Sequence, residues 1–518
     1  MDTPQAPCHD LLVIGGGING AAIARDAAGR GLSVLLCEQG DIGGATSSAS
    51  SKMIHGGLRY LEHYEFRLVA EALAEREVIL RIAPHLARPP SIVMPHVPGL
   101  RPVWMIRLGL FLYDTLGRWR ENATLPASRK IDLHQAPFHG LLKPACRQAF
   151  VYSDVMDDDA RLTLATALSA ARLGADIRPR TQCIKARRDE ISGQTRWHVT
   201  LKNARGESEV LARAIVNAAG PWVAEVLATC QTDATEKGLA QTQTASVRLI
   251  KGSHIVVPRL FDGEEGWLLQ NDDGRVVFVL PFEEKFSLIG TTEIPVEPPV
   301  SPPVASPEEI EYLCRAAGKF FLHAPCPEDV IWHYSGLRPL YEDGHRTPGE
   351  VTRDYVLQCD GQPDQAPMLS VFGGKLTTHR RLAESALEKL GPWFSSMSPP
   401  WTDQIPLVGG DFDDFNQLHG AICQKYPALS PAWLKSLLGR HGTQAEAVLD
   451  GARSPEDLGE NFGGGLFERE AVYFIRHEWA GSAEDILWRR SKTGLHMRNE
   501  ERERFSLWFS RHFPDTSV

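Results

Sequence analysis

The sequence predicts an α/β protein that is built on a doubly wound parallel sheet and ends in a helical domain. Two observations carry this prediction. Residues 10–38 contain a strand, a glycine-rich turn, a helix and a second strand in that order. The part of the chain beyond residue 410 has mainly helical patterns. Strand–helix–strand units of this kind form parallel sheets, because the helix carries the chain back across one face of the sheet.

The first strand is predicted at residues 10–14 and stops at three consecutive glycines. Residues 21–30 are rich in alanine and predict a helix, and residues 32–38 predict a second, buried strand. A longer helix is predicted at residues 65–82, and six prolines at residues 295–307 predict a surface loop. Three later segments have the alternating or β-branched character of strands: residues 197–201, 275–282 and 286–291.

The turn after the first strand has the spacing Gly15-x-Gly17-x-x-Gly20. The first glycine permits a tight turn, the second lets the backbone approach a pyrophosphate, and the third lets helix and strand pack closely. The helix N-terminus adds unpaired N–H donors and a partial positive charge. Glu38 ends the second strand, where a carboxylate is expected to bind ribose hydroxyls. We therefore predict a dinucleotide site, and this fingerprint alone does not distinguish NAD from FAD.

Composition excludes several other classes of protein. The chain has 518 residues, of which 43% are hydrophobic and 23% are charged, as in globular proteins and unlike disordered or fibrous ones. Its formal net charge of −10 argues against nucleic acid as a partner, because phosphate binding needs a surplus of cations. Nine cysteines without a C-x-x-C pair favour reduced thiols and no metal site. The N-terminal residues lack a basic segment and a leading apolar stretch, so we expect no secretory signal.

The residues that follow Glu38 favour FAD over NAD. A polar stretch, ATSSASSKMIHGGLRY, begins at Ala45, where a nicotinamide-binding domain would normally continue with a helix. Its hydroxyls and its amine are expected to reach the pyrophosphate from the side opposite the glycine turn. A helix beginning at Gly373–Gly374 is expected to direct N–H groups at reduced flavin. The further cofactor-binding residues that we expect are Thr46, Ser47, Ser48, Lys52, Gly57, Gly220, Gly373, Gly374, Lys375, Leu376 and Thr377.

With these motifs, the chain resembles the aerobic, bacterial branch of the FAD-dependent glycerol-3-phosphate dehydrogenase family, within the glycine-oxidase and amino-acid-oxidase class of flavoproteins. Small departures from the family pattern are Asn217-Ala218-Ala219-Gly220, His379 and Ser491. The stretches that carry the resemblance are VIGGGINGAAIARDAAGRGLSVLLCE, TSSASSKMIHGGLRYLEHYEFRLVAEALAERE, LIKGSHIVVP, YSGLRPL, TRDY, VFGGKLTTHRRLAE and, near the C-terminus, HEWAGSAEDILWRRSKTG.

The resemblance implies three domains. A glycine-oxidase-like FAD-binding domain is expected at residues 1–80, 150–240 and 350–394. An interleaved substrate domain with an antiparallel sheet is expected at residues 81–149 and 241–349, and a helical cap domain at residues 395–518.

The resemblance also implies an activity and partners. The enzyme is expected to oxidise sn-glycerol 3-phosphate to dihydroxyacetone phosphate by hydride transfer to FAD, and to pass the electrons to ubiquinone or another membrane quinone. We expect a cytoplasmic homodimer that is attached peripherally to the anionic inner face of the cell membrane. Two alternatives stay open: an amino-acid or glycine oxidase that reduces oxygen, and a nonenzymatic flavin-bound sensor or scaffold. An amino-acid substrate needs one carboxylate clamp, whereas this chain offers several cations in its candidate pocket motifs.

A desolvated phosphate needs paired positive charge and fixed donors. The resemblance implies that Arg338 in YSGLRP and Arg353 in TRDY are the main candidates for binding the phosphate or for the alkoxide side, with Arg338 as a catalytic residue, and Arg59 in HGGLRY is a third cation for the substrate. By the same resemblance, Lys375 in GGKLTT is expected near the flavin, and Tyr60 is expected to form one wall of the pocket.

Oxidation of a secondary alcohol needs a base for the hydroxyl proton. Arginine is excluded by its pKa, whereas histidine suits proton transfer near neutral pH. His55 in KMIHGGLRY is the first candidate and His254 in KGSHIVVP the second. Lys375 is an equal candidate for stabilising the alkoxide or the reduced flavin, so the sequence leaves the base open.

The apolar run at residues 103–113 has two interpretations. It is interrupted by Arg107 and is shorter than the roughly 17–25 residues that span a bilayer. One interpretation is a buried helix of the substrate domain that is held by Trp104 and Phe111. The other is a segment at a membrane surface, because aromatic and arginine side chains favour the headgroup region. Between residues 85 and 130, seven Arg and Lys accompany only two Asp and Glu, which makes this region locally basic.

Overall fold

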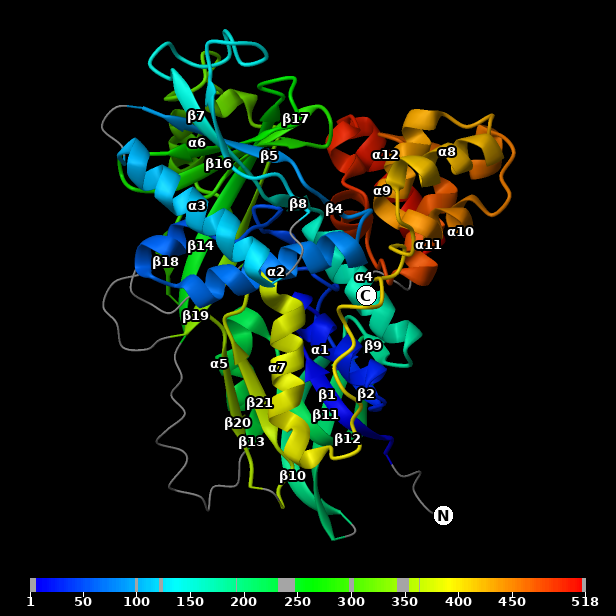
Figure 1. The fold of residues 1–518 in the computed structure, drawn as a ribbon. Helices are drawn as coiled ribbons and strands as arrows, with labels where there is room; N and C mark the ends of the chain where they lie inside the picture. The colour runs from blue at the N-terminus through cyan, green and yellow to red at the C-terminus, as the bar shows by residue number, and fades with distance from the viewer. Residues whose placement is uncertain are drawn as a thin grey trace.

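The structure is a computed structural model that describes residues 6–97, 101–120, 124–191, 193–231, 247–297, 302–341, 354–362 and 364–514. Figure 1 shows two sheet-containing regions, one above the other in that view, with the C-terminal helices packed at one side.

The first sheet has a parallel core, which confirms the predicted α/β class. Its parallel strands run in the order β9 (Asp176–Arg178), β2 (Val34–Cys37), β1 (Cys8–Ile14), β12 (Gly206–Asn217) and β21 (Met368–Phe372). The apolar core on one face of this sheet is shared with three helices: α1 (Ile18–Gly29), α4 (Asp159–Arg172) and α7 (His379–Leu390). The alanine-rich sequence of α1 lets this helix lie close to the strands.

The opposite face of the first sheet is covered by strands. β10 (Gln182–Ile191) and β11 (Gln194–Asn203) form an antiparallel meander with β12. Trp197 and Val199 of β11 belong to the same buried cluster as Leu12 of β1 and Leu35 of β2. A β meander therefore stands where a doubly wound sheet would carry a second layer of helices. Two short edge strands complete the sheet: β13 (Cys230–Gln231) and β20 (Val356–Asp360).

The second sheet is antiparallel except for the parallel pair β15 and β5. Its strands run in the order β18 (Ile294–Val296), β14 (Val247–Pro258), β17 (Phe286–Gly290), β16 (Val276–Phe282), β15 (Gly266–Gln270), β5 (Ser91–His96), β7 (Gln148–Ser153) and β6 (Arg129–Asp132), and β19 (Trp332–Tyr341) also pairs with β14. One face packs on α6 (Pro307–Gly318), and the other packs on α2 (Phe66–Ile82) and α3 (Val103–Arg120). A small third sheet joins β3 (Met53–Ile54), β8 (Val155–Asp157) and β4 (Ala87–Arg88).

The C-terminal region is helical, as predicted. Its helices, which share two buried clusters of their own, are α8 (Phe415–Lys425), α9 (Pro431–His441), α10 (Ala445–Leu449), α11 (Glu468–His477) and α12 (Asn499–His512). A short helix, α5 (Val223–Thr229), follows β12, and a small hairpin, β22 (Asn461–Gly463) with β23 (Leu466–Phe467), precedes α11. The predicted residue limits of the three domains stay a prediction. Two elements cross them, because α2 continues past residue 80 and β7 begins before residue 150.

The elements predicted from local patterns are confirmed at α1, α2, β11, β16 and β17. The helix predicted to begin at Gly373–Gly374 is wrong. Gly373 and Gly374 have φ angles of +74° and +94°, which lie in the left-handed region and cannot continue a right-handed helix. A single 3₁₀ turn at Leu376–Thr378 follows, and α7 begins only at His379.

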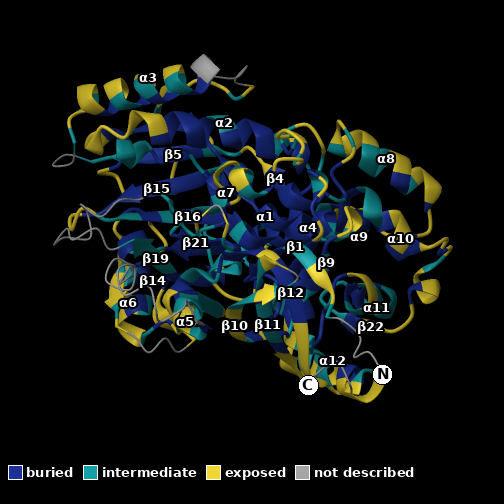
Figure 2. Ribbon diagram, turned by 90° about the horizontal axis from the view of Figure 1, so that it is seen from below, coloured by how far each residue is buried: buried dark blue, intermediate teal, exposed yellow. Residues whose placement is uncertain are grey.

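The position of α3 excludes one of the two interpretations of the apolar run at residues 103–113. Ile106, Leu110 and Tyr113 are buried against the second sheet. Trp104 and Phe111, however, are 65% and 64% exposed, so the interpretation of a buried helix held by these two residues is wrong. Figure 2 shows α3 at the edge of the molecule, with exposed turns on its outer side. Among the residues that the structure describes, no helix has the length and apolar character needed to cross a membrane.

Candidate cofactor and substrate site

A cavity of about 1040 Å³ is lined by residues of both large sheets. The glycine turn after β1, the polar stretch after β2 and the turn after β12 contribute from the first sheet. β14 and β19 contribute from the second sheet, and the residues after β21 complete the wall. The cavity therefore joins the predicted dinucleotide site to the predicted substrate pocket.

The glycine turn brings the first turn of α1 close to the end of β1. A Cβ on Gly20 would lie 1.9 Å from the carbonyl oxygen of Gly15, so only glycine permits the close packing of α1 on β1. Gly15 itself has a φ of +113°. α1 begins at Ile18, whose N–H donates to Ser47 Oγ at 2.9 Å. The polar stretch after β2 thus meets the helix N-terminus at the cavity wall.

Glu38 is held in place by the backbone around it. Its Oε2 accepts from the N–H of Gly16 at 2.7 Å, and its Oε1 accepts from the N–H of Gly40 at 2.7 Å. Burial raises the pKa of the Glu38 carboxyl, and the two backbone donors oppose that rise. The carboxyl group lines the cavity at the end of β2, where a ribose is expected.

Most of the predicted cofactor-binding residues line this cavity: Gly15, Gly17, Glu38, Thr46, Ser47, Gly220, Gly373, Gly374, Lys375, Leu376 and Thr377. Four others are not among its lining residues: Gly20, Ser48, Lys52 and Gly57. Gly20 acts in packing, as the fingerprint requires. Gly57 packs beneath the Tyr60 ring, where a Cβ would lie 2.2 Å from a ring carbon.

Lys52 does not face the cavity. Its buried ammonium group lies 2.7 Å from Asp159 Oδ1 and donates to the Ser48 carbonyl at 3.2 Å. It also lies 4.8 Å from the centroid of the Tyr334 ring. The partner Asp159 is far away in the sequence, so local pattern could not reveal this ion pair. The expected contact of Lys52 with the pyrophosphate is therefore replaced by a structural role.

Four of the predicted substrate residues line the cavity. Arg59, Tyr60, Arg338 and Lys375 all line it. The Lys375 ammonium group lies 4.1 Å from the centroid of the Tyr60 ring. Arg338, on β19, lies 3.3 Å from Glu293 Oε1, and both side chains are partly exposed. Arg353 lies outside the described residues.

His55 and His254 also line the cavity. Burial lowers the pKa of His55, and nearby Lys375 lowers it further, whereas Asp154 raises it. Burial, with the charges of Lys52 and Arg338, lowers the pKa of His254 to about 3. Both imidazoles are therefore neutral at neutral pH, as a general base must be.

The surroundings of the two histidines differ. His254 is hydrogen-bonded to Ser51 Oγ at 2.9 Å and stacks on Tyr334, with the ring centroids 4.9 Å apart. Asp154, which raises the pKa of His55, accepts from Tyr113 at 2.7 Å and from Arg76 at 3.1 Å. The Tyr113 hydroxyl also accepts from the N–H of Gly56 at 2.9 Å, so this buried network holds the backbone next to His55.

These features fit FAD. An adenosine diphosphate fits the tight glycine turn, the helix N-terminus, the fixed carboxylate of Glu38 and the cavity between the sheets. The wall formed after β21 leaves a place for a second ring system.

A family model of FAD dependent oxidoreductases matches residues 10–380, and a model of the C-terminal domain of alpha-glycerophosphate oxidase matches residues 400–505. A glycerol-3-phosphate dehydrogenase of Pseudomonas aeruginosa is 46% identical over 99% of this chain and 98% of that protein.

The chain belongs to the FAD-dependent glycerol-3-phosphate dehydrogenase family. Its cofactor is FAD. The aerobic glycerol-3-phosphate dehydrogenase of Escherichia coli is 44% identical over 96% of this chain and 97% of that protein. A D-erythritol 1-phosphate dehydrogenase of Brucella abortus is 46% identical over 96% of this chain and 97% of that protein. The fold agrees with this family membership. The X-ray structure of a glycerol-3-phosphate dehydrogenase from Bacillus halodurans complexed with FAD matches this structure with a TM-score of 0.71. The two sequences are 23% identical, and the match covers 99% of this chain and 95% of that chain.

Two residues of this family member were not found by sequence reasoning. Ser51 lies in the polar stretch after β2, lines the cavity and is hydrogen-bonded to His254. Arg489 lines the same cavity from the C-terminal region. The stretch around Arg489 resembles the family, but nothing in its local sequence shows that it folds back onto the cofactor site.

Proposed function

We propose that the protein oxidises sn-glycerol 3-phosphate to dihydroxyacetone phosphate and that a membrane quinone receives the electrons. The observation that carries this proposal is the set of three cationic side chains, Arg59, Arg338 and Lys375, that line one cavity with the neutral imidazole of His55. A phosphate-bearing alcohol needs both features, because its anion must be paired and its hydroxyl proton must be accepted.

Each of these side chains has a distinct role in the proposed reaction. Arg338 and Arg59 hold the phosphate, since guanidinium groups bind its oxygens in a fixed geometry. Lys375 stabilises the negative charge that develops on the C2 oxygen. His55 accepts the C2 hydroxyl proton on a ring nitrogen. FAD, when bound, supplies the acceptor for the C2 hydride, so the alcohol loses one hydride and one proton and becomes a ketone.

A longer polyol phosphate is the second candidate substrate. The relative named D-erythritol 1-phosphate dehydrogenase is as similar to this chain, at 46% identity, as the glycerol-3-phosphate dehydrogenase of Pseudomonas aeruginosa. Both substrates carry a phosphate and a secondary alcohol, so the same cations and base serve either. An amino-acid substrate is less suited, because a single carboxylate does not require three cations.

The exposed side of α3 supports the proposed contact with a membrane. Trp104, Leu108 and Phe111 are exposed at spacings of four and three residues, which place them on one side of the helix. Arg107 is exposed on the same helix. An apolar and aromatic face beside cations suits the interface of an anionic bilayer. We place the quinone-linked enzyme there, at the cytoplasmic face of the cell membrane, as a homodimer.

A steady-state assay with a soluble quinone analogue tests the reaction. Glycerol 3-phosphate is expected to support quinone reduction without formation of peroxide, and D-erythritol 1-phosphate and a panel of amino acids are compared under the same conditions. A higher kcat/KM for D-erythritol 1-phosphate would select the second candidate. Peroxide formation with an amino acid, and no activity with either phosphate, would contradict the proposal.

Sedimentation with liposomes tests the membrane contact. The protein is expected to sediment with vesicles that contain anionic lipid, and the double variant Trp104→Ser/Phe111→Ser is expected to stay in the supernatant. Leu507→Ser, which changes an exposed apolar residue on α12, is the matched control. Equal sedimentation of the double variant and the control would contradict the role of α3. Light scattering of the purified protein tests the homodimer separately.

A further inference from the structure

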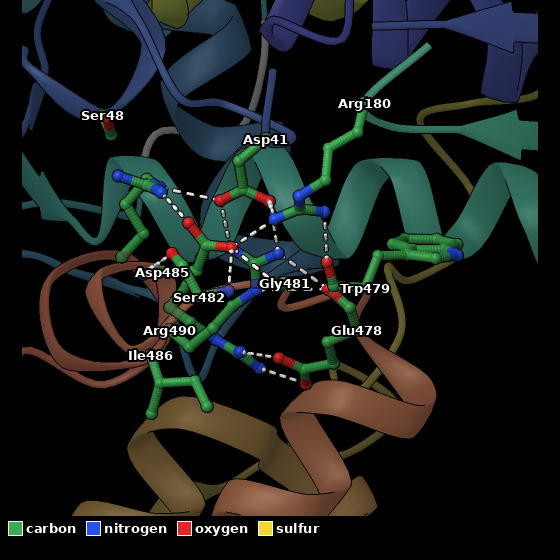
Figure 3. Close-up of polar contacts among 12 residues, drawn as sticks. Asp41, Ser48, Arg180, Glu478, Trp479, Gly481, Ser482, Asp485, Ile486 and Arg490 are labelled. Carbon is green, nitrogen blue, oxygen red and sulfur yellow. Dashed lines mark hydrogen bonds and ion pairs between the residues drawn. The ribbon is translucent and has the colours of Figure 1, made fainter. Parts of the chain in front are cut away.

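A cluster of five charged residues joins the C-terminal region to the loop after β2. It consists of Asp41, Arg180, Asp485 and Arg490, which are labelled in Figure 3, together with Arg489, and we call it the junction cluster. Asp41 lies three residues after Glu38, whereas Asp485, Arg489 and Arg490 lie on a π-helical turn at Asp485–Arg490. Residues more than 400 positions apart in the sequence therefore meet at the wall of the cofactor cavity.

Asp41 is held by two arginines of the C-terminal region. Arg490 makes a two-point contact with its carboxylate, at 2.6 Å and 2.8 Å. Arg489 Nε donates to the same carboxylate at 2.7 Å. Arg490 and Asp41 are both buried, and Arg490 also donates to the carbonyl oxygen of Glu478 at 2.7 Å. These contacts fix the loop after β2 from outside the first sheet.

Asp485 holds the second half of the cluster. Its carboxylate accepts from the backbone N–H groups of Gly481 at 2.8 Å and Ser482 at 3.0 Å. It also pairs with Arg180, which follows β9, and with Arg489 on its own turn. Arg489 is therefore fixed by two carboxylates, one from each side of the domain junction. These two ion pairs set the orientation of its guanidinium group.

The junction cluster carries more positive than negative charge. Three guanidinium groups face two carboxylates, and the nearby carboxylate of Glu478 is paired separately with Arg161. Of the three arginines, only Arg489 is among the residues that line the cavity in the described part of the chain. Arg489 is therefore the arginine through which the positive charge of the cluster faces the cofactor cavity, next to its partner Asp41, which also lines it.

The loop that Arg489 contacts lies directly on the glycine turn. The N–H of Gly43 donates to the carbonyl oxygen of Gly16 at 3.0 Å, and both Gly43 and Gly44 line the cavity with Arg489. The glycine turn and the α1 N-terminus are the part of the site that suits a pyrophosphate. A guanidinium group at this position complements the anionic part of FAD.

We propose that Arg489 is a cofactor-binding residue and that the C-terminal domain completes the FAD site by presenting it to the pyrophosphate. Asp41 and Asp485 act as positioning residues, since each holds the guanidinium of Arg489. The C-terminal domain thus has a role in retaining the cofactor in addition to covering the other two domains. An enzyme whose C-terminal domain is displaced would lose FAD more readily.

The rate of FAD release from the holoenzyme tests this proposal. Arg489→Gln removes the charge, and Arg489→Lys keeps it. Arg504→Gln is the control, because Arg504 of α12 is 50% exposed and pairs with Glu460 away from the cluster. Each purified holoenzyme is diluted, and release of FAD is followed by the rise in flavin fluorescence. Thermal unfolding is measured in parallel with FAD in excess.

Arg489→Gln is expected to release FAD about 10 to 100 times faster than the parent, which is the range for loss of a charge-assisted contact. Arg489→Lys is expected to recover a large part of the difference, and Arg504→Gln is expected to behave as the parent. With excess FAD the unfolding temperatures are expected to stay close together. Unchanged release in Arg489→Gln, with or without a lower unfolding temperature, would overturn the proposal.

If Arg489→Gln does not accumulate as a folded protein, the release rate of Arg489→Lys is compared with that of the parent at low and high salt. A release rate that rises with salt in the parent, and more steeply in the Lys variant, supports a charge contact with FAD. Identical rates at both salt concentrations would overturn the proposal. Substrate is absent from these measurements, so their outcome does not depend on which alcohol the enzyme oxidises.

Discussion

The ammonium group of Lys375 lies 4.1 Å from the centroid of the Tyr60 ring at the cavity wall. This contact joins two segments that are far apart in the sequence, the turn after β21 and the polar stretch after β2. An aromatic face attracts a cation and also limits its movement. The position of the Lys375 charge in the cavity is therefore set by Tyr60.

Replacing Lys375 should slow the chemical step more than it weakens FAD binding. Lys375→Met removes the charge that stabilises the C2 oxygen, and loss of one such group typically lowers kcat by about 100 to 1,000 times. Lys375→Arg keeps a cation and should lose less. Stopped-flow reduction of the bound flavin measures this step. A Met variant that reduces its flavin as fast as the parent would contradict the role of Lys375.

Replacing Arg338 should act on substrate binding. Arg338→Ala removes a phosphate contact, and we expect KM for glycerol 3-phosphate to rise by about 10 to 100 times while FAD stays bound. Arg315→Ala, on the exposed side of α6, is the control. Glu293→Gln removes the ion-pair partner of Arg338 and tests the alternative that Arg338 acts only by pairing with Glu293. If kcat/KM of Arg338→Ala equals that of the parent, the phosphate assignment is wrong.

The pH dependence should identify the base. The pKa of His55 is lowered from its ordinary value of 6.5, and only the neutral ring can accept a proton. The limiting rate of flavin reduction at saturating substrate should therefore be level at neutral pH and fall only as the pH drops below 6.5. His55→Gln should lower the rate and remove this fall at acidic pH. A rate that keeps rising from about pH 7 to about pH 10 would instead indicate a lysine base.

The buried hydroxyl of Tyr113 should contribute to stability. Tyr113→Phe removes the hydrogen bond to Asp154 and leaves the N–H of Gly56 without that acceptor. We expect the free energy of unfolding to fall by about 1–3 kcal/mol. Tyr64→Phe, at an exposed position, should have no effect. Thermal or denaturant unfolding of the two variants with FAD in excess checks this difference, and equal stability would rule out a structural role for the hydroxyl.

Sequence patterns predict those parts of the cofactor site that depend only on neighbouring residues. The glycines at 15, 17 and 20 and the acid at 38 act through the backbone next to them, so their spacing alone predicts the turn that the structure shows. The predicted residues 373–377 also line the cavity, although the helix there begins later than predicted because two glycines adopt left-handed angles.

The rest of the site depends on contacts between distant segments. Among hydroxyl side chains, Lys52 is predicted to be a phosphate ligand. Its ammonium group instead pairs with Asp159 on α4, and both side chains are buried. Arg489 was missed for the opposite reason, since its place at the cavity is created by packing of the C-terminal domain. For Trp104 and Phe111 the sequence left open a buried helix or a segment at a membrane surface, and only the packing of α3 reveals that they face outward.

The most direct test of the proposed function is anaerobic reduction of the bound flavin. The holoenzyme is mixed with glycerol 3-phosphate in the absence of oxygen and quinone, and the visible absorption band of oxidised flavin is followed. We predict that the band is lost with one equivalent of substrate oxidised per flavin and that it returns when a quinone is added. A band that stays unchanged with glycerol 3-phosphate, in an enzyme whose flavin is reduced by another alcohol or amine, would contradict the proposed activity.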